Sequence, residues 1–209
     1  MKLLIAIPTK DQMPYQFVES LLNLTRRLDA DGIDYDVAFQ GGTLVYVGRD
    51  KLALKGISGD YTHMLWLDAD MVFTEDLFAD LYDTGKKFVT GVAHSRREPY
   101  QSCIFMEIYP GVQKHMGEYP TNTFKIAGCG LACALIDVEI VRDVWSHHST
   151  AFFPTREFGE DIAFCKRVQD LGHEIWAEPS VKVGHVGSMV IYPDYEEIYR
   201  NCFLGVQDA

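Results

Sequence analysis

Strand-like and helix-like hydrophobic patterns alternate along the first half of the chain. Apolar runs of strand length occupy residues 3–7, 34–39, 62–67 and 88–93. Between them, apolar side chains recur at helical spacing, most clearly over residues 15–28. Further helices are predicted over 74–85 and, after a short extended piece at 44–47, from about Arg49 to residue 58. The alternation predicts an α/β fold with a mostly parallel central sheet, covered on both faces, that binds ligands at the carboxyl ends of its strands.

The hydrophobic pattern is less regular in the second half of the chain. Residues 94–125 are aromatic-rich and lack a regular period, so we expect irregular structure there. Helices are predicted over 137–145 and 160–171, the second ending at Gly172. Short strands are expected at 175–177 and 181–183, followed by a loop at 184–187. Because the sequence contains no repeat or linker, residues 1–209 are expected to form a single domain.

Composition narrows the class of protein. With 209 residues, 47% of them hydrophobic, the chain is long enough for one complete core. Its formal net charge of −11 disfavours broad binding to nucleic acids or anionic membranes, although a local basic patch could hold one phosphate. The apolar start ends at Pro8, which favours a first strand over a signal peptide, and no transmembrane segment is expected. Five cysteines without CxxC spacing indicate neither disulfides nor zinc, so a cytoplasmic location is expected.

One of three Asp-x-Asp pairs stands out by its position. The pairs at 29–31 and 34–36 lie in a polar turn after a helix and are expected to be solvated. Asp68 and Asp70 instead follow an apolar strand and precede the apolar residues 71–73. Burying carboxylates there is unfavourable unless a cation or hydrogen-bond donors compensate. The alternative is an acid pair that caps a helix.

Two later segments carry further candidate chemistry. Glu160 and Asp161 open a helix, where the helix dipole stabilises carboxylates, so ordinary capping is an alternative interpretation. His185 lies between two glycines after a strand and could equally be an ordinary core or surface histidine. The glycines would let the backbone approach a bound group closely. An imidazole with carboxylate and phosphate oxygens is a workable octahedral set for Mn²⁺ or Mg²⁺.

Taken in order, these segments resemble a known family. The series IPT, GRD-x-L, LDADM, a glycine-containing strand, GEDIAFCKRVQDLGHEIW and V-x-V-GHVG is similar to glycosyltransferases of GT-A (Rossmann-like) fold, nearest to family 2. The resemblance spans about residues 3–187. It implies metal-dependent transfer of a sugar from a nucleotide-diphosphate sugar to an acceptor hydroxyl, with inversion expected and retention open. It also implies a donor-binding half at about 1–93 and an acceptor and catalytic half at about 94–209.

The resemblance assigns donor-binding roles residue by residue. Pro8 and Thr9 match the loop that lies along the nucleoside. Arg49 matches the arginine that approaches the donor phosphates, and we expect it to begin a helix after a turn at Gly48. Asp68 matches the acid that contacts the ribose or the sugar.

Metal-binding and catalytic roles follow from the same resemblance. Asp70 and His185 match the protein ligands of the divalent metal, Mn²⁺ or Mg²⁺, with Asp68 beside them. Asp161 matches the general base that deprotonates the acceptor hydroxyl. Glu160 is then an acceptor-binding or supporting group.

The sequence also departs from the family pattern. Gln40 stands where members often carry an acid that reads the nucleobase, so uridine is not implied, and Asp50 follows Arg49 where asparagine is usual. The stretch 94–125 is expected to shape the acceptor side with Arg96, Arg97, Tyr100 and Tyr109. It does not identify the acceptor as a glycan, protein, lipid or small molecule.

Two other functions compete with the transferase. One is a catalytically silent module that binds nucleotide-sugars or carbohydrates. The other is a nucleotidyltransferase of related fold, which would need a glycine-rich, basic loop after the first strand, and residues 7–14 do not supply one.

Overall fold

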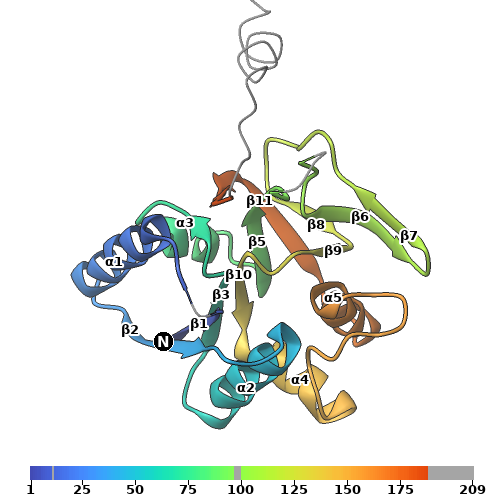
Figure 1. The fold of residues 1–209 in the computed structure, drawn as a ribbon, viewed down its shortest axis with the longest axis horizontal. Helices are drawn as coiled ribbons and strands as arrows, with labels where there is room; N and C mark the ends of the chain where they lie inside the picture. Colours follow the sequence, from blue (N-terminus) through green and yellow to red (C-terminus); the bar gives the residue numbers. More distant parts are fainter. Residues whose placement is uncertain (11, 97–99, 188–209) are drawn as a thin grey trace, which may run out of the picture.

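A seven-stranded sheet forms the centre of the computed structural model, which describes residues 1–10, 12–96 and 100–187 (Figure 1). The strand order is β2-β1-β3-β10-β5-β11-β8. The bounds of these strands are Lys2–Pro8 for β1, Asp34–Gln40 for β2, His63–Leu67 for β3, Phe88–Val92 for β5, Phe124–Ile126 for β8, Cys133–Asp137 for β10 and Ile175–Lys182 for β11.

The sheet is mixed but has a dominant direction. The pairs β1–β2, β1–β3 and β5–β11 are parallel, whereas β10 is antiparallel to both of its neighbours and β8 is antiparallel to β11. Strands β1, β2, β3, β5 and β11 therefore run the same way. The α/β fold with a partly parallel sheet is confirmed. Because β1, β2 and β3 are adjacent and parallel, their carboxyl ends meet at one edge of the sheet.

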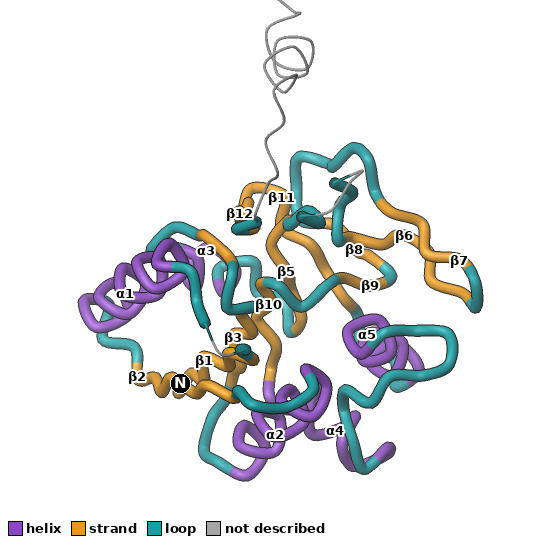
Figure 2. Tube along the Cα trace, in the orientation of Figure 1, coloured by secondary structure: helices purple, strands orange, loops and turns teal. Residues whose placement is uncertain are grey.

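Helices cover both faces of this sheet, as Figure 2 shows. Strand β1 is buried on both sides, with Leu4 and Ala6 in one hydrophobic cluster and the alternate residues Leu3, Ile5 and Ile7 in the other. The first cluster contains the apolar faces of α2 (Val45–Ser58), α4 (Val138–His148) and α5 (Glu160–Asp170). The second contains those of α1 (Tyr15–Ala30) and α3 (Leu77–Tyr82). None of the helices in the described part of the chain is long and apolar enough to span a membrane.

Two small sheets lie outside the central one. Strand β4 (Met71–Val72) pairs with β12 (Gly184–His185), where only a loop was expected. Strands β6 (Ile104–Tyr109), β7 (Val112–His115) and β9 (Gly128–Cys129) form the other. The prediction of irregular structure over 94–125 was therefore wrong for residues 104–115, which form the hairpin of β6 and β7. Every residue of β7 is exposed, so this strand has no buried face to produce an apolar alternation in the sequence.

The start of α2 also differs from the prediction. Residues 45–47 are helical rather than extended, so Arg49 lies within the helix and does not begin it. Two β-branched valines favoured the extended interpretation, and tertiary packing overrides that local preference. Gly48 suits this packing, because a Cβ atom there would lie 3.4 Å from Gln40 Cγ. A small residue thus lets α2 approach the end of β2 closely.

Other element boundaries shifted in similar ways. Helix α3 is shorter than the predicted 74–85, and the two strands expected near 175–183 are one strand, β11. Pro179, inside β11, interrupted the sequence pattern. The pairing register of β11 with β5 shifts between Ala177 and Lys182, so the proline sits where regular pairing is already broken.

Candidate active site

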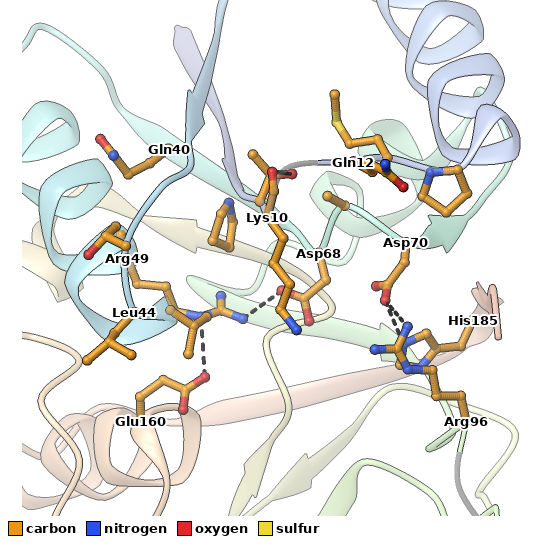
Figure 3. Close-up of a pocket in the computed structure, with 18 residues that line it drawn as sticks. Lys10, Gln12, Gln40, Leu44, Arg49, Asp68, Asp70, Arg96, Glu160 and His185 are labelled. Carbon is orange, nitrogen blue, oxygen red and sulfur yellow. Dashed lines mark hydrogen bonds and ion pairs between the residues drawn. The ribbon is translucent and has the colours of Figure 1, made fainter. Parts of the chain in front are cut away.

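A cavity of about 610 Å³ opens at the edge where β1, β2 and β3 end (Figure 3). Every residue given a donor-binding, metal-binding or catalytic role from the sequence, apart from Asp161, lines it: Pro8, Thr9, Arg49, Asp68, Asp70, Glu160 and His185. Tyr100 and Tyr109, expected on the acceptor side, do not. The lining includes Arg96, Glu160 and His185, which are distant in sequence from the first-half strands. The cavity is therefore built from both halves of the chain.

Asp68 is fixed at the end of β3 and carries a partly buried carboxyl group, whose side chain is 32% exposed. Its backbone N–H donates to the Ala132 carbonyl at 3.1 Å, and its carboxylate accepts a 2.7 Å hydrogen bond from Arg49 Nη2. Burial raises the pKa of Asp68, while the charge of Arg49 acts to lower it. The cation that burial of this acid requires is thus supplied by the protein itself.

Arg49 is a buried cation between two carboxylates. Its side chain is 3% exposed, and its Nε lies 3.7 Å from Glu160 Oε1, opposite the contact with Asp68. Nε and Nη1 have no hydrogen-bond partner among the described residues. Buried donors are rarely left unpaired, so these two atoms indicate a missing hydrogen-bond acceptor next to the cavity.

The pairing of β4 with β12 brings His185 to Asp70. His185 is opposite Met71 in this pairing, and the Val186 N–H donates to the Asp70 carbonyl at 2.8 Å. His185 Nδ1 lies 3.1 Å from the His94 carbonyl, which can only accept, so Nδ1 carries a proton. His185 Nε2 faces Asp70 Oδ2 at 3.4 Å. The backbone therefore orients the imidazole toward the carboxylate.

Arg96 contacts the same carboxylate oxygen. Its Nη1 lies 2.5 Å from Asp70 Oδ2 and 3.4 Å from the Val186 carbonyl. Burial would raise the pKa of Asp70, but the His185 hydrogen bond and the charges of His185 and Arg96 lower it overall. The hydrogen bond to Asp70 raises the pKa of His185, against the effect of burial. The sequence placed Arg96 on the acceptor side; the structure places its side chain against Asp70 in the cavity, and Arg97 lies outside the described residues.

Asp70 and His185 together have the chemistry of a divalent-cation site. No group of three or more histidine, cysteine or acidic side chains in the described segments is arranged to hold a metal. A carboxylate and an imidazole whose Nδ1–H is bound to a backbone carbonyl nevertheless fit Mn²⁺ or Mg²⁺, if ligand and water oxygens complete the set. Among the cavity-lining residues of the described segments, these two could hold such an ion, with Asp68 lining the same cavity.

Glu160 and Asp161 occupy the first turn of α5 but face different surroundings. Glu160 lines the cavity and lies against Arg49. Asp161 Oδ1 accepts a 2.7 Å hydrogen bond from the Ile162 N–H, and its Oδ2 lies toward Gly130, where an added Cβ would be 3.6 Å away. Burial, followed by the charge of Glu160, raises the pKa of Asp161 to about 6. Such a carboxyl group can accept a proton near neutral pH.

The loop that leads into α5 is tied to α2 by Asp50. Asp50 Oδ1 accepts 2.9 Å hydrogen bonds from the N–H groups of Ala151 and Phe152, and Oδ2 accepts from the Thr150 hydroxyl. Arg167 donates to the Ala151 carbonyl at 2.8 Å. Every partner of Asp50 is a donor, which explains an acceptor-only carboxylate at this position. The sequence identified Asp50 as a departure from the family pattern but not its role.

One side of the cavity is formed by the ends of β1 and β2, where the sequence predicts the nucleoside-binding loop. The Thr9 N–H donates to the Gln40 carbonyl at 2.9 Å, and Gln40 Nε2 donates to the Gly41 carbonyl at 3.0 Å. Lys10 follows directly and extends into the cavity in Figure 3. Sequence reasoning missed Lys10, although its place directly after the predicted first-strand loop was a usable signal.

Comparisons with known proteins show similarity at the level of structure. No protein-family profile and no curated protein matches the sequence. The structure of A197 from STIV superposes with a TM-score of 0.62 at 20% identity, covering 90% of this chain and 87% of that one. GalNAc-T7, crystallised with UDP, GalNAc and Mn²⁺, gives a TM-score of 0.62 at 10% identity. The protein has a GT-A fold.

A third structure agrees with this fold assignment. The catalytic domain of Drosophila beta1,4galactosyltransferase 7, in complex with xylobiose, gives a TM-score of 0.54 at 13% identity. It covers 93% of this chain and 78% of its own. The match to GalNAc-T7 covers 95% of this chain but 47% of that protein, so the chain spans about half of its length. At these identities the shared GT-A fold is what the comparisons show.

Proposed function

We propose that this protein is a metal-dependent glycosyltransferase that moves a sugar from a nucleotide-diphosphate donor to an acceptor hydroxyl with inversion. The observation that carries the proposal is the convergence, in a GT-A fold, of Arg49, Asp68, Asp70, Glu160 and His185 on one cavity. GalNAc-T7, which shares the fold, was crystallised with UDP, GalNAc and Mn²⁺.

The charges of the cavity support a metal-dependent donor. Its lining carries three carboxylates, Asp68, Asp70 and Glu160, and three permanent cations, Lys10, Arg49 and Arg96. An anion that entered alone would meet as much negative as positive charge. A diphosphate accompanied by a divalent cation adds little net charge and suits such a balanced site.

Different residues of the cavity are proposed to bind the metal, the sugar, the nucleoside and the phosphates of the donor. Asp70 and His185 would hold Mn²⁺ or Mg²⁺, which when bound offsets the charge that develops on the diphosphate leaving group. Asp68, held by Arg49, is positioned to accept hydrogen bonds from ribose or sugar hydroxyls. Pro8 and Thr9 border the nucleoside, and the unpaired nitrogens of Arg49 favour an anion nearby.

Asp161 is the proposed general base. With a pKa raised to about 6 it is mostly ionised at neutral pH yet basic enough to take the proton of an acceptor hydroxyl. Glu160, between Arg49 and the cavity, supports the acceptor or orients Arg49. The acceptor belongs to one of four classes: glycan, protein, lipid or small molecule.

A catalytically silent nucleotide-sugar-binding module is the second candidate. It is favoured by the Arg96–Asp70 contact, which supplies Asp70 with a cation from the chain itself. It differs from the transferase in requiring no turnover of the donor.

The donor and metal assignments are tested by thermal unfolding with a panel of nucleotide-sugars, with and without Mn²⁺. A ligand that binds the folded state raises the melting temperature, and at a fixed ligand concentration a tighter-binding ligand raises it more. We expect at least one nucleotide-sugar to stabilise the protein only with Mn²⁺, and Asp70→Ala to abolish this stabilisation. Undiminished Mn²⁺-dependent stabilisation of Asp70→Ala would remove Asp70 from the metal site.

A further inference from the structure

We propose that Arg96 is an exchangeable counter-ion: it pairs with Asp70 while no divalent cation is bound, and with a donor phosphate once a cation occupies Asp70. This inference rests on the proposed function. It gives Arg96, which the sequence assigned only to the acceptor side, a role in binding both the cation and the donor phosphate, and it couples the two.

Arg96 and a bound divalent cation would compete for one oxygen atom of Asp70. Asp70 Oδ2 receives both Arg96 Nη1, at 2.5 Å, and His185 Nε2, at 3.4 Å. A cation held by Asp70 and His185 needs the electron pairs that these contacts now use. Arg96 is positively charged as well, so its present position opposes a second cation by repulsion.

Arg96 can move away from Asp70 without disturbing the fold. Its side chain is 44% exposed, in contrast to the enclosed Arg49, and its other contact, with the Val186 carbonyl, is long at 3.4 Å. Ion pairs with this degree of exposure contribute little to stability. Exchange of the Arg96 contact therefore requires no disruption of the core.

Arg96 already lies at the cavity where the donor phosphates are proposed to bind. It lines the same space as Lys10 and Arg49, and Figure 3 shows its guanidinium directed at Asp70 on the opposite side of the cavity from Arg49. A planar guanidinium can form two parallel hydrogen bonds to a phosphate group. A small rotation about the long side chain would exchange one oxyanion partner for another.

The first measurement uses Mn²⁺ alone, with free Mn²⁺ followed by electron paramagnetic resonance. Because Arg96 competes with the ion, Arg96→Ala should bind Mn²⁺ roughly 2- to 5-fold more tightly than the unaltered protein. Arg26→Ala, which removes an exposed arginine of α1 that does not line the cavity, should leave Mn²⁺ affinity unchanged.

The second measurement uses inorganic pyrophosphate in the presence of excess Mn²⁺, followed by calorimetry. Arg96→Ala should now bind about 10-fold more weakly, since a charge-assisted contact to phosphate is lost. Arg96→Gln should behave in the same way and serves as the second variant if Arg96→Ala folds poorly.

Tighter binding of Mn²⁺ together with weaker binding of pyrophosphate by Arg96→Ala supports the exchange. Weaker binding in both would mean that Arg96 holds the site together, and tighter binding in both would mean that it only blocks the cation; either result overturns the proposal, as does no change. If the unaltered protein binds no Mn²⁺, or if Asp70→Ala binds it equally well, the metal site of the proposed function fails first, and the inference fails with it.

Discussion

At the first turn of α5, Asp161 carries a carboxyl group whose pKa is raised to about 6, first by burial and then by the charge of Glu160. Its neighbour Glu160 lies against Arg49 and faces the cavity instead. The two acids are consecutive in sequence, yet one is matched with a cation and the other is not. This difference suits Asp161 to the proposed role of proton acceptor and Glu160 to that of a supporting group.

The raised pKa of Asp161 predicts a pH-dependent effect on stability. An aspartate in the unfolded chain titrates near 3.9, so between about pH 4 and 6 the folded state binds more protons, and stability falls as pH rises through about 6. Asp161→Asn removes this loss. By urea unfolding, the variant should gain about 2–3 kcal/mol over the unaltered protein at pH 8 and little at pH 4. An equal difference at both pH values would contradict the assignment.

Lys10 provides a second prediction at this scale. It lines the cavity, is exposed, and has no ion-pair partner among the described residues, whereas Arg49 and Arg96 are paired. Lys10→Ala should weaken Mn²⁺-pyrophosphate binding about 10-fold without changing the affinity for Mn²⁺ alone. Lys51→Ala, an exposed lysine of α2 that does not line the cavity, is the control. Calorimetry showing equal affinity for Lys10→Ala would exclude Lys10 from anion binding.

Single residues were partly predictable from the sequence. Asp68 and Asp70 could be singled out because two acids directly after an apolar strand need compensation. Their pairing with Arg49 and Arg96 could not be predicted, because each contact depends on how segments distant in sequence pack together. The aspartates are recognisable from the residues next to them in the sequence, whereas the contacts of the arginines form only when the chain folds.

At the scale of elements, the site depends on two connections. The short pairing of β4 with β12 brings His185 to Asp70, and Asp50 ties the loop before α5 to α2. Neither is visible as a hydrophobic period, since two-residue strands and side-chain-to-backbone hydrogen bonds leave none. The sequence pattern therefore located the long elements and missed the small ones that position the chemistry.

The Asp50 connection predicts a graded effect. Asp50→Ala would leave the N–H groups of Ala151 and Phe152 without their acceptor and should destabilise the protein by about 1–3 kcal/mol. Asp50→Asn keeps one oxygen and should lose less. Urea denaturation of both variants tests this order. Equal stability of Asp50→Ala and the unaltered protein would mean that water replaces these hydrogen bonds without penalty.

At the scale of the whole molecule, the alternation of strand-like and helix-like hydrophobic patterns predicted the α/β class. It did not predict the order of the strands in the sheet. Strand β10 lies antiparallel between β3 and β5, which are consecutive long strands in the sequence. A strand buried on both faces is apolar throughout, whether it lies parallel or antiparallel to its neighbours. The sequence between residues 126 and 136 therefore could not reveal that β10 inserts between β3 and β5. The insertion matters for the site, because the residue preceding β10, Ala132, supplies the carbonyl that fixes Asp68.

The most direct test of the account is release of nucleoside diphosphate from the nucleotide-sugar that stabilises the protein, followed by mass spectrometry with and without Mn²⁺. The unaltered protein should release it only with Mn²⁺. Asp70→Ala should abolish release, and Asp161→Asn should slow it roughly 10²- to 10⁴-fold while still binding the donor, the range expected for loss of a general base. If the folded protein binds the donor with Mn²⁺ but never turns it over with a panel of acceptors or with water, or if Asp161→Asn matches its rate, the account of this chain as a glycosyltransferase built on Asp70 and Asp161 is wrong.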